Sequence, residues 1–328
     1  MRSSPQLLLP QVYLKDATRR IQCAKHHVSL LTMIVVEDET TQPLIDALCE
    51  AALRGIAVTV TADTFTYSEV GGHMRLHTKN SLKVRHIAAM QHRLVAAGVH
   101  FRWLGKSTSS LVNGRTHSKW LVVDDYVYTF GGVNIYEHGI TNIDYMFRLD
   151  DTILADRIVS EQQRIIKADK NGHTYRSHAF GDDTNLVLVD GGFFGDSIIY
   201  RHACRLTAEA KKVTYVSQYC PTGKLGRLLK KTDSTLYFNQ WNKADSLNAL
   251  VIRAGSFISN HKTIYTRDTY LHAKCMIFEL ENGKKAALSG SHNFSHGGVW
   301  LGTREIALET RDPRIIHQLE LFIKTHVA

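Results

Sequence analysis

The sequence of 328 residues predicts an α/β protein whose two halves share one design. Two observations lead to this prediction. A pattern of helix, strand, helix and strand near the N-terminus returns after residue 197, and a short polar motif occurs twice, 155 residues apart. Alternation of helical and strand periodicity is typical of α/β layers, and the repetition of both features indicates an internal duplication.

The first half begins with the pattern of a layered domain. An amphipathic stretch near 16–24 predicts a helix, and the apolar run at 28–36 (VSLLTMIVV) predicts a buried strand after it. A second helix fits 43–54, because Pro43 favours a helix start and Gly55 a helix end. The alternating run that follows Gly55 (IAVTVTAD) predicts the next strand.

The second half repeats this order. We expect a helix at 197–210, a strand at 211–219, a short basic helix near 223–231 and a strand at 234–238. The chain is therefore expected to be internally duplicated.

The predicted domain boundaries follow from the repeat. The first half covers 1–168 and carries the first motif copy, and the second half covers 186–328 and carries the second copy. The stretch at 169–185 is polar and broken by glycine, which is typical of a linker.

The first half contains additional residues. Aligning Ala24 with Ala210 gives an offset of 186, whereas the motif copies are offset by 155, so about 31 residues are extra in the first half. We expect this insertion at about 64–93, a segment rich in Lys, Arg and His. Such a segment could contact a phosphorylated head group or a membrane surface, and a solvated helix and loop fits it equally well.

Composition limits the class of protein. Hydrophobic residues make up 44% and charged residues 22% of the chain, as in soluble globular proteins, and no apolar run reaches the length of a membrane span. We therefore expect a cytoplasmic protein, or one bound only peripherally to the inner face of a membrane. The net charge of +9 favours anionic partners, either nucleic acid or an anionic lipid surface. Five widely spaced cysteines suggest free thiols.

The repeated motif combines an imidazole, an ammonium group, a carboxylate and a carboxamide, which is the set of groups that a phosphodiester substrate needs. A third HxK triplet, His77 and Lys79, lacks both the acid and the following GxxN, so we exclude it. The members of the first copy are His117, Lys119, Asp124, Gly131, Gly132 and Asn134, and those of the second are His272, Lys274, Glu279, Gly290, Ser291 and Asn293.

Spacing within the motif predicts its geometry. The His and Lys are two residues apart at the start of an apolar run, so a strand would project both from one face. A hairpin then leads to the glycine pair or Gly-Ser. Glycine lets the backbone approach a ligand closely, and the Asn amide can donate to an oxyanion.

With these motifs the chain resembles the phospholipase D superfamily, in which HxKxxxxD followed by GxxN occurs twice in one bilobed protein. The resemblance covers nearly the whole chain. It implies a duplicated fold of two α/β/α lobes, related by a pseudo-twofold axis, with both HxK pairs in one shared cleft. Two positions depart from the pattern: Glu279 replaces Asp, and Gly132 stands where Ser291 stands in the second copy. The resulting GGxN is similar to that of cardiolipin synthase-like members.

The resemblance also implies roles for the motif residues. His117 would be the nucleophile and His272 the general acid and then base, although the reverse order is compatible with the sequence. The side chains that would hold the phosphate oxygens are Lys119, Lys274, Asn134 and Asn293, with Ser291, Gly132 and Gly290 beside the substrate. Asp124 and Glu279 would be structural. The implied mechanism uses no metal and no cofactor.

Each half also supplies an acid 10 to 12 residues after its Asn, namely Asp144 and Glu305. An acceptor on the second ring nitrogen fixes the tautomer of a catalytic His. The family pattern suggests that these acids cross between the halves, with Glu305 on His117 and Asp144 on His272.

These features predict a phosphodiester-cleaving enzyme. We expect a phospholipid substrate, a phosphohistidine intermediate, and transfer to water or an alcohol, as in a cardiolipin synthase-like phosphatidyltransferase. A metal-independent nuclease on the same fold is the alternative, because the reacting bond is similar and DNA is anionic. An inactive binding module is disfavoured, because both copies retain His, Lys and Asn.

Overall fold

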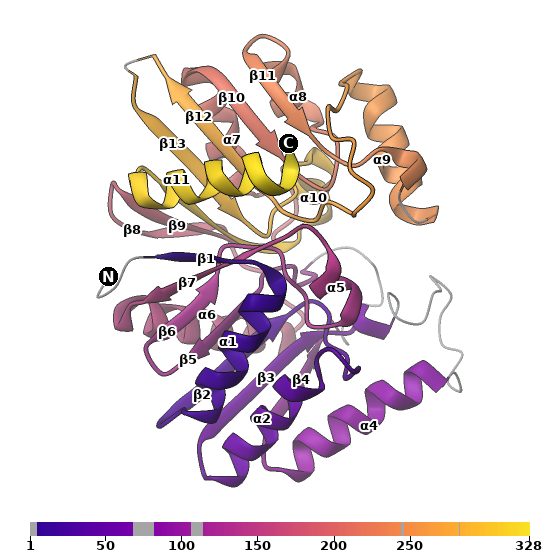
Figure 1. Ribbon diagram of the computed structural model, residues 1–328, viewed down its shortest axis with the longest axis vertical. Helices are drawn as coiled ribbons and strands as arrows, with labels where there is room; N and C mark the ends of the chain where they lie inside the picture. Colours follow the sequence, from indigo (N-terminus) through magenta and orange to yellow (C-terminus); the bar gives the residue numbers. More distant parts are fainter. Residues whose placement is uncertain (1–4, 68–81, 106–113, 244–245, 282) are drawn as a thin grey trace.

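The computed structural model describes residues 5–67, 82–105, 114–243, 246–281 and 283–328. They form two lobes, each built on a seven-stranded sheet (Figure 1). The predicted two-lobed α/β fold is therefore confirmed. The first sheet contains β1 (Gln6–Leu8), β2 (His27–Thr32), β3 (Ala57–Asp63), β4 (His100–Leu104), β5 (Trp120–Val123), β6 (Tyr126–Thr129) and β7 (Met146–Asp150). The second contains β8 (His178–Gly181), β9 (Asn185–Gly191), β10 (Ala210–Val216), β11 (Asp233–Tyr237), β12 (Cys275–Leu280), β13 (Lys285–Gly290) and β14 (Arg304–Thr310).

Helices cover both faces of each sheet. The outer face of the first sheet packs on α1, α2 and α4, that of the second on α7 and α8, and the layer between the sheets holds α6 and α11. The α-helices of the first lobe are α1 (Pro10–Gln22), α2 (Gln42–Leu53), α4 (Leu82–Ala96), α5 (Glu137–Thr141) and α6 (Thr152–Lys170). Those of the second are α7 (Ile198–Glu209), α8 (Gly223–Leu229), α9 (Ser246–Ser259), α10 (His296–Leu301) and α11 (Pro313–Phe322). Two shorter helices, η1 (Trp241–Lys243) and η2 (Ile323–Val327), precede α9 and follow α11.

The two sheets repeat one topology. Six strands of the first sheet lie in the order β3-β2-β5-β6-β7-β1, and six of the second in the order β11-β10-β12-β13-β14-β9. Corresponding neighbours also agree in direction, since β2–β3 and β10–β11 are parallel and the other equivalent pairs are antiparallel. The duplication thus extends to strand order and orientation.

The extra residues of the first half are divided between two places. Leu31 and Val216 occupy equivalent positions beside the motif strands and lie 185 residues apart. Their partners on the next parallel strands, Thr61 and Tyr237, lie 176 residues apart. Nine extra residues therefore lie between β2 and β3 and 21 between β3 and the first motif, so the insertion is not confined to 64–93 as the sequence suggested.

Part of the expected insertion, residues 68–81, lies outside the described residues. Residues 82–93 belong to α4, which leads into β4, an edge strand parallel to β3. Among the described strands β4 has no counterpart in the second sheet. Periodicity predicted α2 closely, but α1 begins at Pro10 rather than near residue 16, and β2 ends at Thr32 rather than at 36.

A common core joins the lobes. Apolar side chains from the inner faces of both sheets and from α6 and α11 form one buried cluster, in which the rings of Tyr145 and Phe322 meet edge to face at 4.8 Å. Burial of such a layer is the main source of stabilisation between packed elements. None of the described helices is both long and apolar enough to traverse a bilayer.

Candidate active site

Backbone contacts across the lobe boundary bring the two motif copies together. The amides of His117 and of the residue after it both donate to the carbonyl of Arg304 at 2.9 Å. In the same way, the amides of His272 and of the residue after it donate to the carbonyl of Ile143 at 2.9 Å. Each histidine is therefore fixed by backbone from the opposite lobe.

These contacts change one expectation from the sequence. The HxK residues were expected on a strand, but β5 begins at Trp120 and β12 at Cys275, so both triplets lie immediately before their strands. The residues that lead into each triplet instead form a one-residue β-bridge to the other lobe. This exchange positions His and Lys at the boundary between the sheets.

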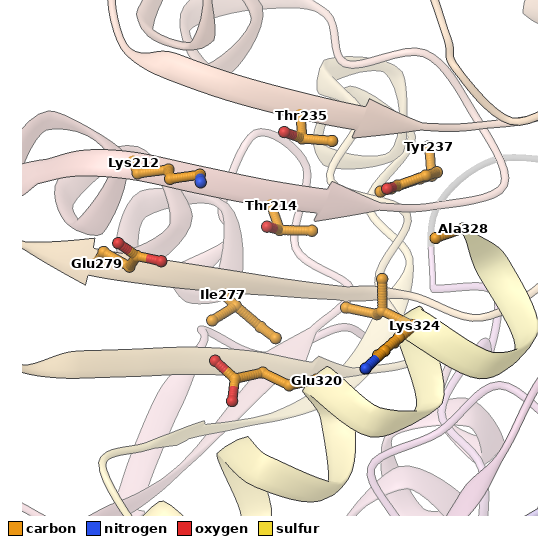
Figure 2. A pocket seen from close by; sticks show the side chains of 10 residues that line it. Lys212, Thr214, Thr235, Tyr237, Ile277, Glu279, Glu320, Lys324 and Ala328 are labelled. Carbon is orange, nitrogen blue, oxygen red and sulfur yellow. The ribbon is translucent and has the colours of Figure 1, made fainter.

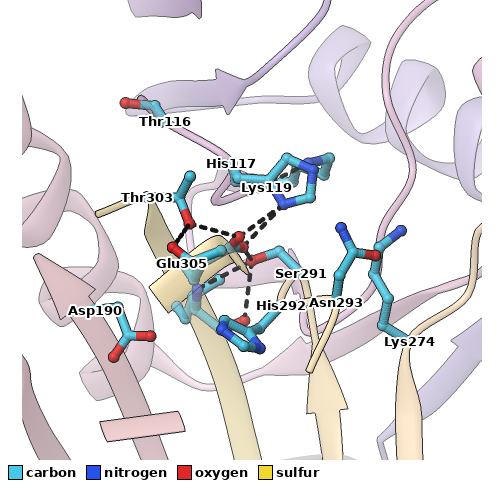
Figure 3. Close-up of polar contacts among 12 residues, drawn as sticks. Thr116, His117, Lys119, Asp190, Lys274, Ser291, His292, Asn293, Thr303 and Glu305 are labelled. Carbon is cyan, nitrogen blue, oxygen red and sulfur yellow. Dashed lines mark hydrogen bonds and ion pairs between the residues drawn. The ribbon is translucent and has the colours of Figure 1, made fainter. Parts of the chain in front are cut away.

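His117 is paired with an acid from the second lobe. Its Nδ1 lies 3.0 Å from Oε2 of Glu305 (Figure 3). The same carboxylate accepts hydrogen bonds from the hydroxyl groups of Ser291 and Thr303, the latter at 3.2 Å. A neutral His that donates from Nδ1 keeps its lone pair on Nε2, so this arrangement prepares Nε2 for attack or proton transfer.

His272 has the reciprocal arrangement. Its Nδ1 lies 2.7 Å from Oδ2 of Asp144, which belongs to the first lobe. The amides of Gly132 and Tyr145 donate to Oδ1 of this carboxylate at 3.2 and 2.8 Å. A Cβ on Gly132 would lie only 2.6 Å from Asp144 Oδ2, so the carboxylate occupies the space that the side chain of Ser291 fills in the other copy.

The carboxylates and imidazoles differ in charge state. Burial works to raise the pKa of Glu305, but the charge and hydrogen bond of His117 lower it to about 2. In Asp144 the hydrogen bond and charge of His272 likewise outweigh burial and lower the pKa. Burial lowers the pKa of His117, and burial together with Lys274 lowers that of His272 to about 4. The ligand-free centre therefore holds two carboxylates and two neutral imidazoles at neutral pH.

Two buried lysines complete the charge of the centre. Lys119 is 1% exposed and Lys274 is 0% exposed, and each ammonium group donates to the carbonyl of the histidine two residues before it. Burial lowers the pKa of Lys119 to about 8, and burial with the charge of Lys119 lowers that of Lys274 to about 7. An anion bound between them would relieve this penalty, because an opposite charge favours the protonated amine.

The two Asn side chains have different surroundings. The carboxamide of Asn134 is buried and accepts a long hydrogen bond from the hydroxyl of Thr32 at 3.5 Å. The Oδ1 of Asn293 is buried and has no hydrogen-bond partner among the described residues. Figure 3 shows Asn293 beside Lys274, with both side chains directed toward the space near His117. A buried Oδ1 without a partner leaves the carboxamide free to turn toward a ligand.

Gly290 was expected beside the substrate, and the structure gives it a packing reason. A Cβ at Gly290 would lie 2.2 Å from the carbonyl oxygen of Ile306, and one at Gly131 would lie 1.8 Å from that of Tyr145. These glycines therefore permit close contact between β13 and β14 and between β6 and β7. They hold Glu305 and Asp144 next to the histidines.

The two motif acids have unequal environments. Asp124 accepts hydrogen bonds from the amides of Lys25, His26 and His27 at 2.9 to 3.0 Å, so it fixes the turn that enters β2. Glu279 lies opposite Lys212 on β10 and lines a pocket of about 280 Å³ on the inner face of the second sheet (Figure 2). The carboxylate of Asp124 thus has a structural contact for which Glu279 shows no equivalent in the described part of the chain.

Sequence reasoning missed the supports around His117. Arg304 is 2% exposed and donates to the carbonyls of Gly114 and His173 at 2.6 and 3.0 Å, which ties the segment before the motif to the linker. The carboxylate of Asp63, at the end of β3, accepts hydrogen bonds from the guanidinium of Arg115 at 2.7 Å and from the amide of Thr116 at 2.9 Å. In the sequence, only the proximity of these arginines to Glu305 and His117 marks them.

In the described ranges, no group of three or more His, Cys, Asp or Glu side chains has an arrangement that could hold a metal ion. The centre itself supplies two ammonium groups where phosphoryl-transfer sites commonly place cations.

Comparisons with known proteins agree with this geometry. The family model described as "Cardiolipin synthase, PLD-like domain" matches residues 17–167. The crystal structure of phosphatidylserine synthase from Haemophilus influenzae Rd KW20 aligns with a TM-score of 0.72 at 13% identity, over 99% of this chain and 87% of that chain. No curated protein matches the sequence.

Polyphosphate kinase from Porphyromonas gingivalis aligns with a TM-score of 0.65 at 12% identity, over 98% of this chain but only 50% of its own. At these identities the solved structures show the fold alone. The family model matches residues 17–167, which carry the first motif copy, and together with the fold this match supports a phospholipase D superfamily protein.

Proposed function

We propose that the protein cleaves phospholipid phosphodiesters through a phosphohistidine intermediate and transfers the phosphatidyl group to water or an alcohol. The observation that carries the proposal is the pair of reciprocal contacts, His117 with Glu305 and His272 with Asp144. Two oriented imidazoles around one site with two buried lysines can serve as a nucleophile and an acid–base partner.

In the first step, Nε2 of His117 forms a bond to phosphorus while the bond to the leaving oxygen breaks. His272 gives its Nε2 proton to that oxygen. In the second step, His272 takes a proton from water or an alcohol, whose oxygen bonds to phosphorus as the bond to His117 breaks. The anionic substrate favours protonation of His272, whose pKa of about 4 describes the ligand-free site.

Lys119, Lys274, Asn134 and Asn293 would bind the non-bridging oxygens. Their charge and donors act where negative charge collects in the five-coordinate transition state. In Asn293 the Nδ2 group would be the donor to these oxygens, and no hydrogen bond from the described protein holds its buried Oδ1 in place.

A phospholipid substrate is supported by the matching family, whose description names cardiolipin synthase, and by the net charge of +9. The phosphatidylserine synthase with the same fold is, by its name, also a phospholipid enzyme. The polyphosphate kinase shares the fold as well, and a panel of phosphodiesters distinguishes these substrate classes.

The experiment is a substrate panel in EDTA. Phosphatidylglycerol vesicles, with ethanol as an added alcohol, and single-stranded DNA would be incubated with the protein, and products identified by mass spectrometry. Free glycerol or a new phosphatidyl alcohol is the expected result. Cleavage of DNA without any lipid product would assign the site to nucleic acid instead.

Variants connect the product to the centre. His117→Ala and His272→Ala should each lower turnover by about a thousandfold or more. His317→Ala, on the exposed side of α11, is the matched control and should retain activity. Turnover that survives loss of either motif histidine would contradict the shared centre.

A further inference from the structure

Helix α9 presents an apolar face to solvent. Leu250 and Phe257 are 65% and 89% exposed, and Ala254 lies between them on the same outward face. Ile252 and Ser259 face the protein and are buried. A surface helix normally has the opposite arrangement, with apolar residues inward and polar residues outward. An outward apolar stripe of this kind marks an interaction surface.

Exposed cations flank this helix in the sequence. Residues 223–268 contain eight Lys and Arg and three acidic residues, of which Asp268 pairs with Lys243 at 2.8 Å. The indole of Trp241 is 51% exposed, and the guanidinium of Arg253 lies 5.3 Å from its ring centre. The cations, all exposed, are Lys224, Arg227, Lys230, Lys231, Lys243, Arg253, Lys262 and Arg267.

The segment that leads to α9 contacts the second motif copy. The side chain of Asn239, just after β11, bonds both the amide and the carbonyl of Leu271, the residue before His272, at 2.9 and 2.7 Å. Trp241 follows two residues later, and α9 comes next. Figure 1 shows α9 at the outer edge of the second lobe, beside α8.

A second exposed aromatic pair follows the second motif copy. Trp300 on α10 is 51% exposed and stacks edge to face on Phe194 at 5.0 Å. Thr222 connects this helix to α9, because its hydroxyl accepts from the amide of His296 at 3.0 Å and its methyl group lies next to Gly255. The two helices that carry exposed apolar side chains are therefore linked through Thr222.

We propose that Trp241, Leu250, Val251, Arg253 and Phe257, the α9 surface, dock the protein on an anionic phospholipid bilayer. The apolar face would enter the boundary between head groups and acyl chains, and Trp241, Arg253 and the lysines would contact the head groups. A second copy of the chain fits less well, because two such cationic surfaces repel each other. The proposal rests on the proposed function, since it brings the centre to its phospholipid substrate.

The test uses the full chain and flotation with vesicles of phosphatidylcholine, with or without phosphatidylglycerol. The double variant Leu250→Asp/Phe257→Asp should bind the anionic vesicles at least about tenfold more weakly than the wild type. The matched control is Leu53→Asp/Ile153→Asp, which adds the same charge at positions 73% and 75% exposed on the first lobe. This control should bind nearly as the wild type does.

A soluble substrate separates this proposal from the proposed function. The α9 double variant should hydrolyse bis(p-nitrophenyl) phosphate at the wild-type rate while losing activity on vesicles.

Two binding results would overturn the docking surface. In one, the control variant loses vesicle binding as much as the α9 variant does; in the other, the α9 variant binds vesicles as tightly as the wild type. A dimer that becomes monomeric only in the α9 variant, without vesicle binding by the wild type, would assign the surface to self-association and also overturn it. Vesicle binding without any phosphodiester turnover would contradict the proposed function alone.

Discussion

Glu305, on the second sheet, accepts a hydrogen bond from Nδ1 of His117, which lies in the first lobe, at 3.0 Å. The reciprocal contact joins Asp144 to His272 at 2.7 Å. Because each histidine takes its orienting acid from the other half, neither half contains a complete centre. The duplicated lobes are thus coupled through the reacting groups themselves.

Replacement of Glu305 by Gln tests this coupling. The amide keeps the size of the side chain but presents an N–H as well as an oxygen to His117, so the Nδ1–H tautomer is no longer enforced. We expect kcat to fall by about a hundredfold to ten-thousandfold. Steady-state kinetics on the substrate identified by the panel would measure the loss.

The chain supplies a matched control on the same strand. Glu309 is 2% exposed and lies 2.6 Å from Nδ1 of His202, so it forms a buried His–carboxylate pair outside the centre. Glu309→Gln should lower the melting temperature but preserve kcat. An equal loss of kcat in both variants would show that Glu305 acts only through stability.

The acids of the two His–carboxylate pairs are supported differently, and this difference is testable at Gly132. In Gly132→Ser the new Cβ would lie 2.6 Å from Oδ2 of Asp144, so the carboxylate must move away from His272. We expect kcat to fall by about tenfold or more, consistent with loss of one charged hydrogen bond. Ser291→Gly, at the equivalent position, removes a donor to Glu305 without a clash and should cost less. A larger loss in Ser291→Gly would contradict this steric account.

Gly131→Ala should destabilise the protein strongly. The added carbon would lie 1.8 Å from the backbone oxygen of Tyr145, which cannot move without separating β6 from β7. We expect a cost of about 2 kcal/mol or more in the free energy of unfolding, measured by denaturant titration. Gly297→Ala, where the new carbon meets open space, is the control and should be neutral or slightly stabilising.

Sequence patterns predicted the repeat because hydrophobic periodicity and motif spacing are local properties. They predicted α2 and the strands around the motifs, and the family resemblance suggested which acid faces which histidine. Local patterns could not show that His117 precedes β5 and bonds to the carbonyl of Arg304, since that contact depends on the packing of the lobes. For the same reason Gly132 was expected beside the substrate, whereas its missing side chain makes room for Asp144.

Lys274→Met should make the ligand-free protein more stable while reducing its activity. The pKa of Lys274 is about 7 in the folded protein, below its ordinary value of 10.5, because burial and Lys119 oppose its charge. Between these values the unfolded chain binds a proton that the folded chain does not, so the free energy of unfolding rises with pH. Below about pH 7 the buried charge of Lys274 therefore lowers the free energy of unfolding of the wild type by its full amount. This destabilisation disappears towards about pH 10. We expect Lys274→Met to be more stable by roughly 1–3 kcal/mol near pH 7, and this advantage to disappear as the pH approaches about 10.

Thermal unfolding of both proteins across this range would measure the difference. Lys285→Met, which removes the half-exposed partner of Glu320, is the control and should show no such stabilisation. A melting temperature below that of the wild type at every pH would mean that Lys274 stabilises the empty site rather than being held there, at a cost, for an anionic ligand.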